Sequence, residues 1–209
     1  MLLSYDHRFI FIHNYRVAGT SIRKSLEKYV KRPLLRRIFK EMGVGNNLSH
    51  HKWKTFPAHI KASDLRKRLP AEIYDSFYKF AFVRNPWDWQ VSLYHYMCQN
   101  KNHHQHEIVK KLSFCEYVDW RVNYDIKYQK DFIFDDNGIQ LVDYVGKIES
   151  LQADFNNICD RIKVPKTILS IRNQSIHQHY KKYYSEDSKH KIETAFKEDI
   201  ELFGYSFNE

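Results

Sequence analysis

Residues 78–94 read YKFAFVRNPWDWQVSLY, and this stretch decides the fold. Its first six residues are mostly apolar and aromatic, as in a strand buried on both faces. Pro86 favours the first turn of a helix, and Val91 and Tyr94 share one face of that helix. The stretch therefore predicts a buried strand, a short loop and a helix, the repeating unit of α/β folds.

The same order recurs on either side of this unit. Residues 8–13 predict a strand, followed by a helix that contains Ile22 and Leu26. Residues 144–148 predict another strand, followed by an amphipathic helix over 151–162. The alternation predicts a three-layer α/β fold, with a mainly parallel central sheet flanked by helices, in a single domain over residues 1–209.

Local signals predict the ends of the other elements. A hydroxyl or a proline marks a helix start, and Asn-Gly or a final Gly marks a turn or a helix end. The expectations are an N-cap at Ser63, a helix start at Pro70, a capping box of Ser113 and Glu116, a hairpin over 132–145 turned at Asn137-Gly138, and a last helix from Ser185 to Gly204.

The composition excludes several classes of protein. The chain has 209 residues, a formal net charge of +9, 43% hydrophobic residues and only 6 glycines. The hydrophobic content excludes a disordered chain, and the scarcity of glycine disfavours the glycine-rich nucleotide loops. The positive charge favours phosphates, sulfates or acidic polymers as partners.

Cysteine and histidine patterns give no sign of a metal site. The three cysteines are widely spaced, and the histidine cluster at 103–106 lies in a polar stretch without matching carboxylates, so we expect no metal. The apolar N-terminal run is interrupted at residues 6–8, and no later run approaches the roughly 18 residues of a membrane span. We therefore expect a soluble, cytoplasmic protein.

Residues 13–21, HNYRVAGTS, lie between the first expected strand and its helix. Free N–H groups at a helix start attract an anion to this point. Arg16 adds a positive charge, and Gly19 permits close approach of the backbone. The hydroxyls of Thr20 and Ser21 can donate hydrogen bonds. An ordinary strand-to-helix turn capped by hydroxyls would look the same.

A second candidate anion site lies at the end of the strand over 78–83. Arg84 stands where open parallel sheets bind ligands, and Ser92 follows about two turns along the next helix. A guanidinium and a hydroxyl suit a terminal phosphate, provided that the helix packs back over the strand end. In the alternative interpretation, Arg84 forms a salt bridge with Asp88.

Together these segments resemble the PAPS-dependent sulfotransferases, in particular the carbohydrate sulfotransferase branch, where PAPS is 3′-phosphoadenosine 5′-phosphosulfate. The resemblance is carried by HNYRVAGTS at 13–21, FVRNPWDWQVSLY at 82–94, YVGKIESLQADF at 144–155, and Asn173-x-Ser175 through Tyr183-Tyr184. It spans nearly the whole chain. It implies a P-loop-like fold and metal-free transfer of a sulfuryl group from PAPS to a saccharide hydroxyl.

The resemblance also implies residue roles. The 5′-phosphosulfate is bound by the first loop and the 3′-phosphate by the strand-end arginine and helix serine, which here are Arg16, Gly19, Thr20 and Ser21, then Arg84 and Ser92. The family's loop usually reads Pro-Lys-Thr where this chain has residues 15–17, YRV. Arg16 therefore takes the catalytic charge of the lysine, cannot donate a proton near neutral pH, and lacks a threonine hydroxyl beside it.

His59 lies 25 positions before Arg84, in the segment PAHI at 57–60. Related carbohydrate sulfotransferases place a proposed catalytic base in a similar histidine motif, so the resemblance implies that His59 is the base. The pKa of an imidazole suits removal of a proton from an attacking hydroxyl. Chance placement is the counter-interpretation in a chain with 12 histidines. We interpret His13 as structural, and Glu149 equally well as a helix-start carboxylate.

Two other enzyme classes would also place an anion-binding loop between a strand and a helix. A P-loop kinase needs GxxxxGK[ST] and a strand-end Asp, and a dinucleotide-binding fold needs a third glycine where this chain has Leu48; both patterns fail. A non-enzymatic nucleic-acid or polyanion-binding protein stays an alternative on charge and aromatic content, without any recognisable nucleic-acid motif. The acceptor is expected to be a saccharide, with acidic and neutral glycans both open.

Overall fold

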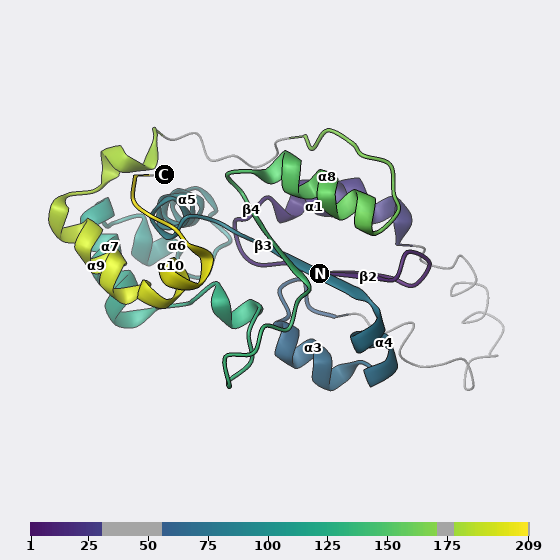
Figure 1. Cartoon of the computed structure of the whole chain (residues 1–209). Helices are drawn as coiled ribbons and strands as arrows, with labels where there is room; N and C mark the ends of the chain where they lie inside the picture. The colour runs from purple at the N-terminus through teal and green to yellow at the C-terminus, as the bar shows by residue number, and fades with distance from the viewer. Residues whose placement is uncertain (31–55, 171–177, 209) are drawn as a thin grey trace.

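The computed structural model describes residues 1–30, 56–170 and 178–208. Its centre is a four-stranded sheet (Figure 1) with the spatial order β1 (Leu2–Ser4), β2 (Phe9–Ile12), β3 (Tyr78–Val83) and β4 (Tyr144–Lys147). The last three strands run parallel, and β1 is antiparallel to β2. The expected mainly parallel sheet is confirmed, while the sequence pattern did not indicate the edge strand β1.

Alternate side chains of the strands point to opposite faces of the sheet. Phe80 and Phe82 pack in one core cluster with residues of α1 (Gly19–Leu26) and α8 (Leu151–Arg161). Ala81 and Val83 pack in a second cluster with residues of α3 (Ala62–Arg68) and α4 (Ala71–Ser76). Figure 1 shows these two pairs of helices on opposite sides of the sheet. The three-layer arrangement is therefore confirmed.

A third core cluster lies in a helical lobe that follows β3. It joins α5 (Pro86–Gln99), α7 (Phe114–Tyr124) and α9 (Glu186–Ala195) through Trp89, Tyr117 and Phe196. The shorter elements are η1 (Glu27–Tyr29), α6 (His106–Val109), η3 (Lys130–Phe132), η4 (Tyr180–Tyr183) and α10 (Lys197–Phe203). The lobe holds α5 so that its first turn begins just beyond β3 (Figure 1).

Most of the expected helix ends are found. Pro86 occupies the first position of α5, and the N-cap Asn85 accepts from the Trp87 N–H. Ser113 and Glu116 form the expected capping box of α7. The expected N-cap at Ser63 is wrong, because α3 already begins at Ala62 and Lys61 is its N-cap residue. The helix therefore starts two residues earlier than expected, which places the fully buried Ala62 within its first turn.

Two expected elements are interrupted. The hairpin is reduced to an isolated bridge between Phe134 and Gln140, although Gly138 adopts the left-handed conformation expected of the turn, with φ 76°. The last helix is divided at Phe196 into α9 and α10. Phe196 packs edge-on against Trp89, so burial of its ring fixes the break. Gly204 ends α10 in the left-handed conformation, as expected.

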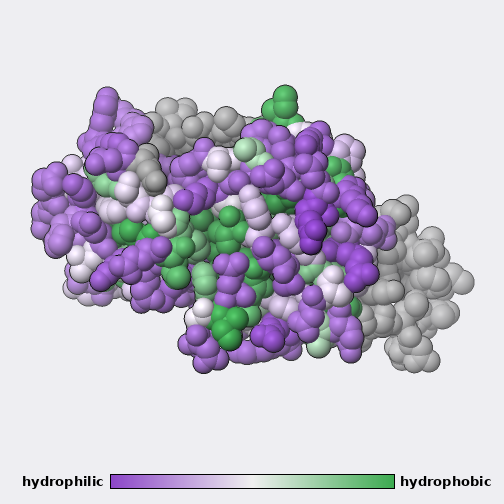
Figure 2. All heavy atoms as spheres, viewed as in Figure 1, coloured by the Kyte–Doolittle hydropathy of each residue, from purple (hydrophilic) through white to green (hydrophobic). Residues whose placement is uncertain are grey.

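Parts of the sequence lie outside the described residues. These are residues 31–40, which are rich in Lys and Arg, the polar residues 43–51, and Asn173-x-Ser175 of the resemblance. In the parts of the chain that are described, no helix has the length and apolarity needed to cross a membrane. The cytoplasmic location and the single domain stay predictions. The face shown in Figure 2 is largely hydrophilic, with hydrophobic residues gathered across its middle.

Candidate active site

The loop over residues 13–21 leads from the carboxyl end of β2 into α1. Arg16 and Ala18 have left-handed backbone conformations, with φ 56° and 55°. Such conformations cost a non-glycine residue about 1–3 kcal/mol, and they cluster at functional sites. Val17 between them is fully buried and anchors the loop. The loop is thus held in one strained shape by its core contact.

The N-terminus of α1 is open to an anion. No side chain caps this end, and the N–H groups of Ser21 and Ile22 donate to the Ala18 carbonyl. The amides that precede Ser21 are therefore the expected donors to a bound anion. The side chain of Thr20 is exposed, whereas that of Ser21 is buried. Of the two hydroxyls, the structure places only that of Thr20 at the surface.

The His13 ring leaves no room for a side chain at Gly19, whether or not a ligand is bound. A Cβ atom at Gly19 would lie 1.7 Å from Nε2 of His13. The His13 ring is stacked on Phe11, with ring centroids 5.5 Å apart, and lies beside the His59 ring at 4.4 Å. It therefore has little room to move aside. The imidazole occupies the space that a side chain at position 19 would need.

We expect Gly19→Ala to lower the free energy of unfolding by about 1–3 kcal/mol, the usual cost of overpacking. The backbone of Gly19 does not need glycine, because its φ is not positive. His13→Ala should make the Gly19 substitution nearly neutral in a double-mutant cycle measured by urea unfolding. An unchanged stability of Gly19→Ala, with loss of anion affinity alone, would assign Gly19 to ligand approach instead.

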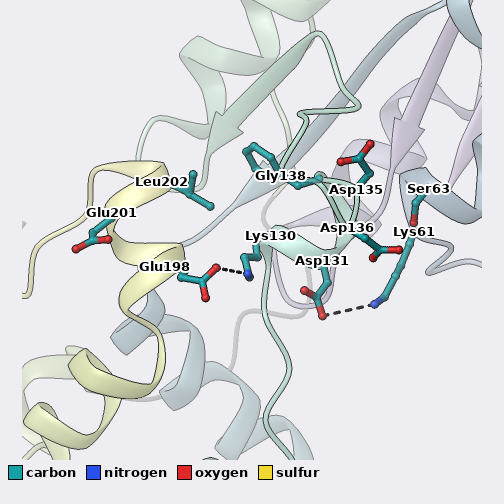
Figure 3. Close-up of a pocket in the computed structure, with 11 residues that line it drawn as sticks. Lys61, Ser63, Lys130, Asp131, Asp135, Asp136, Gly138, Glu198, Glu201 and Leu202 are labelled. Atoms are coloured by element: carbon teal, nitrogen blue, oxygen red, sulfur yellow. Dashed lines mark hydrogen bonds and ion pairs between the residues drawn. The ribbon is translucent and has the colours of Figure 1, made fainter.

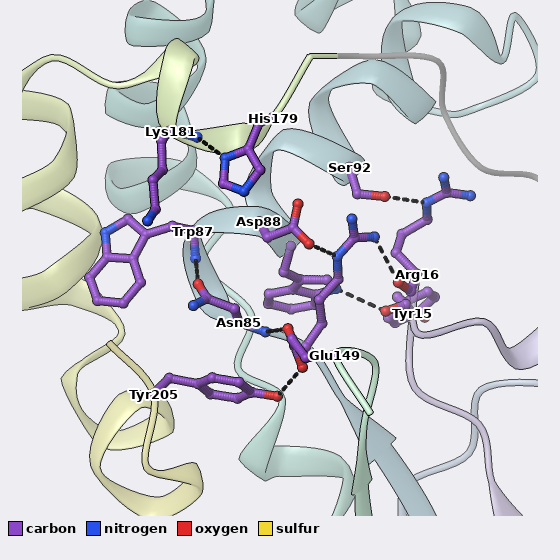
Figure 4. Close-up of polar contacts among 12 residues, drawn as sticks. Tyr15, Arg16, Asn85, Trp87, Asp88, Ser92, Glu149, His179, Lys181 and Tyr205 are labelled. Atoms are coloured by element: carbon purple, nitrogen blue, oxygen red, sulfur yellow. Dashed lines mark hydrogen bonds and ion pairs between the residues drawn. The ribbon is translucent and has the colours of Figure 1, made fainter. Parts of the chain in front are cut away.

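Arg16 lies over α5 and contacts Ser92 and Tyr96. Its Nε donates to Ser92 Oγ at 3.1 Å (Figure 4), and its guanidinium carbon lies 4.8 Å from the centre of the Tyr96 ring. Ser92 is fully buried, and Tyr96 follows it by one turn of the helix. The aromatic face attracts the cation and fixes its plane. The helix therefore packs back over the strand end, as the second anion site requires.

Arg84 is brought to the same place from the end of β3. Its Nε lies 2.6 Å from Asp88 Oδ2, so the alternative interpretation of a salt bridge is observed. Its Nη1 also donates to the Arg16 carbonyl at 3.4 Å. Burial, followed by the nearby charge of Arg84, lowers the pKa of Arg16. Two half-buried arginines this close favour a polyanion between them.

Two side chains hold this arrangement, of which Gln129 was missed in the sequence and Glu149 was named there without this role. The Gln129 amide donates to the Arg84 carbonyl at 2.7 Å, and its oxygen accepts from the Arg84 N–H at 2.9 Å. Glu149 accepts from the Asn85 N–H at 2.8 Å and from the Tyr205 hydroxyl at 3.0 Å (Figure 4). Glu149 is thus more than a helix-start carboxylate. A lone Gln carries no pattern that could have indicated its role.

His59 lies next to the 13–21 loop. Its Nδ1 is 2.9 Å from the His13 carbonyl, and its ring stacks on Tyr15 with centroids 4.2 Å apart. A carbonyl only accepts, so Nδ1 carries the proton and the neutral ring keeps a lone pair on Nε2.

Burial lowers the pKa of His59. Burial and the neighbouring His59 lower the pKa of His13 to about 3. Both rings are therefore neutral at pH 7.

The other histidine cluster has local partners. His103 and His104 stack on each other with centroids 4.5 Å apart, and His106 Nδ1 lies 2.9 Å from the Met97 carbonyl. Among the described residues, no group of three or more His, Cys, Asp or Glu side chains is arranged to hold a metal ion. We assign no metal-binding role to these histidines.

Comparison with known proteins gives a family match over almost the whole chain. The model of the sulfotransferase family matches residues 4–206. Mouse sulfotransferase SULT7A1, solved in complex with PAP, has a similar fold with a TM-score of 0.54 at 14% identity, covering 98% of this chain and 91% of that chain. An uncharacterized protein of Archaeoglobus fulgidus is 28% identical over 127 residues, which are 56% of this chain and 94% of that protein.

The mainly parallel sheet and its flanking helices define a P-loop-like α/β protein. The uncapped start of α1 and the two converging arginines lie at the carboxyl edge of its sheet. The chain belongs to the sulfotransferase family. The expected fold and enzyme class are thereby confirmed. The roles of individual residues and the saccharide acceptor stay predictions.

Proposed function

We propose that this enzyme transfers a sulfuryl group from PAPS to a hydroxyl of a saccharide. The observation that carries the proposal is the convergence of Arg16, Ser92 and Arg84 at one edge of the sheet, with His59 bound to the His13 carbonyl of the same loop. PAPS carries anionic groups at two ends, and the structure offers one cation from each of two strand ends. The PAP complex of the mouse neighbour supports a donor of this type.

The 13–21 loop would bind the 5′-phosphosulfate. Amides at the start of α1 and the Thr20 hydroxyl offer neutral donors, and Arg16 offers a full charge. As the sulfur–oxygen bond to the phosphate breaks, that phosphate takes the electron pair and leaves as part of PAP. Fixed donors stabilise this developing charge without rearrangement. Arg16 donates to the buried Ser92, so the guanidinium proposed for the 5′-phosphosulfate is in contact with the hydroxyl proposed for the 3′-phosphate.

His59 would remove the proton of the acceptor hydroxyl. The oxygen of that hydroxyl forms the new bond to sulfur, and its proton passes to Nε2 of the imidazole. The hydrogen bond from Nδ1 to the His13 carbonyl orients the ring so that Nε2 is the basic atom. Arg16 remains charged throughout, since a guanidinium does not titrate near neutral pH. The two residues therefore have separate roles, base and electrostatic stabiliser.

PAP should raise the melting temperature far more than ATP with magnesium does. PAP has phosphates at the 3′ and 5′ positions, which match the two cationic ends of the site, whereas ATP lacks the 3′-phosphate. At a concentration of about 100 times the Kd, a ligand stabilises the folded state by about 2.7 kcal/mol. Differential scanning fluorimetry with both nucleotides at equal concentration measures the difference.

Two outcomes would contradict the proposed donor. Equal shifts with PAP and ATP, or a requirement for magnesium, would favour a nucleotide kinase chemistry. Tighter binding of single-stranded nucleic acid than of PAP would favour a polyanion-binding role, for which the net charge of +9 is the supporting feature. Transfer of labelled sulfate from PAPS to a panel of glycans then tests the reaction itself.

A further inference from the structure

A cavity of about 830 Å³ is lined in part by Lys61, two residues after the proposed base, and shares no residue with the proposed donor site. It is bounded by the start of α3, the segment over 130–138 and α10 (Figure 3). Its volume is within the range of small-molecule sites, which is about 300–1,000 Å³. The cavity is therefore large enough for one or two sugar rings.

Ring contacts connect this cavity to His59. Lys61, which lines the cavity, follows His59 by two residues. Phe132 follows the lining residue Asp131, and its ring meets Tyr15 edge-on at 5.4 Å. Tyr15 in turn stacks on His59 at 4.2 Å. The rings of Phe132 and Tyr15 therefore form a continuous path of contacts from the segment that lines the cavity to His59.

The charge of the cavity is opposite to that of the chain. Its lining holds two lysines and five carboxylates, which are Asp131, Asp135, Asp136, Glu198 and Glu201. Both lysines are already paired, Lys61 with Asp131 at 3.5 Å and Lys130 with Glu198. The lining thus has three more carboxylates than lysines, although the chain as a whole carries a net charge of +9. The local field favours cations and repels anions.

The three remaining carboxylates, of Asp135, Asp136 and Glu201, form few hydrogen bonds and ion pairs within the protein. One oxygen of Asp135 accepts from the N–H groups of Asn137 and Ile139. Glu201 lies 3.7 Å from Lys197 on the same helix, an exposed pair that contributes little. Each carboxylate offers several acceptor positions, so most stay available for ligand hydroxyl or ammonium donors.

The wall of the cavity also has an apolar part. Phe134 and Leu202 line it, and half of the Leu202 surface is exposed to solvent (50%). Apolar side chains beside a few placed polar groups are the usual composition of small-molecule sites. A sugar ring combines these features, since it carries apolar C–H faces and hydroxyl donors at its edge. An acidic sugar would add an anion that this lining opposes.

We propose that this cavity binds the acceptor and selects neutral or amine-bearing saccharides against acidic ones. The proposal rests on the sulfotransferase reaction proposed above and adds to it the class of acceptor. The site is separate from the arginines that would hold the donor. The net basic charge of the chain, which suggests an acidic glycan, therefore does not describe the acceptor site.

Binding and transfer are measured with three oligosaccharides of equal length: one of glucosamine, its N-acetylated form and one containing uronic acids. For wild-type enzyme we expect at least tenfold tighter binding of glucosamine than of the uronic-acid oligosaccharide by calorimetry in the presence of PAP, and the same order in kcat/KM. Asp136→Lys/Glu201→Lys should reverse this order and leave the thermal shift with PAP unchanged.

The matched control is Glu72→Lys/Glu193→Lys, which makes the same change in net charge at exposed positions outside the cavity lining. A control that alters selectivity as much as the cavity variant would overturn the proposal, because selectivity would then follow total charge. Tighter binding of the uronic-acid oligosaccharide by wild-type enzyme would also overturn it. Selective binding without any sulfate transfer would contradict the proposed reaction while supporting the cavity as a saccharide site.

Discussion

His59→Asn should lower kcat by about 10²–10⁴-fold, the usual contribution of a general base, while the fold and PAP binding are retained. The asparagine amide can place an N–H where Nδ1 of His59 now donates to the His13 carbonyl. It offers no basic atom in the place of Nε2. The substitution therefore removes the chemistry and preserves the contact. Turnover is measured with labelled PAPS and PAP affinity by thermal shift.

Two further variants make this result decisive. His59→Ala removes both the base and the donor to His13, so it should lose turnover and also some stability. His59→Gln places its amide near Nε2 and leaves the His13 carbonyl without its partner. If His59→Asn retains wild-type turnover, the base is another residue. If it loses PAP binding as well, His59 serves the structure of the donor loop.

The rate should depend on pH with a defined sign. Burial lowers the pKa of His59 from its ordinary value of 6.5, and the hydrogen bond with the His13 carbonyl opposes part of this effect. The base acts only when neutral, so kcat/KM falls as the pH drops through that lowered pKa. The acid limb of wild-type enzyme should lie below pH 6.5, and the residual activity of His59→Asn should lack it.

Arg84→Ala should weaken PAP binding by about 10- to 150-fold and change 5′-AMP binding far less. Only PAP carries the 3′-phosphate, and a lost charge-assisted contact is worth about 1.5–3 kcal/mol. The structure adds a second effect, because Asp88 lies 2.6 Å from Arg84 and would then face the phosphate alone. Like charges repel, so the single variant combines lost attraction with new repulsion. Calorimetric titration with both nucleotides gives the ratio.

Asp88→Asn separates the two effects. Arg84→Ala/Asp88→Asn should recover part of the PAP affinity, and what remains lost is the contribution of the guanidinium itself. Ser92→Ala should act in the same direction as Arg84→Ala but more weakly, since one neutral hydrogen bond is removed. Equal loss of PAP and 5′-AMP affinity in Arg84→Ala would show that the arginine only forms a structural salt bridge.

Several elements could be predicted because their signals are local. The strand over 78–83 is recognisable from six consecutive residues, and the helix after it from Pro86 at its first position. The capping box of Ser113 and Glu116 needs only residues three positions apart. The split at Phe196 could not be predicted, because it depends on packing against Trp89, more than 100 positions away.

The sequence also indicated only part of the candidate site. Arg16, Arg84, Ser92 and His59 were named from motifs, and the structure brings all four to the carboxyl edge of the sheet. No motif indicated that Tyr96 would support the Arg16 guanidinium. The sign of charge in the neighbouring cavity was not visible either, because its carboxylates come from two separate segments of the chain.

By itself, the sequence determined the order of strands and helices and the types of residue that follow each strand. Their spacing is read along the chain, where periodicity and capping act over a few residues. Only the tertiary structure decided which of these residues meet. Gln129 holds both backbone groups of Arg84 from 45 positions away, and Asp199 accepts from the Gln129 N–H from 70 positions away. Such contacts form because packing of distant helices against one core brings buried polar groups together, and each must then find a partner.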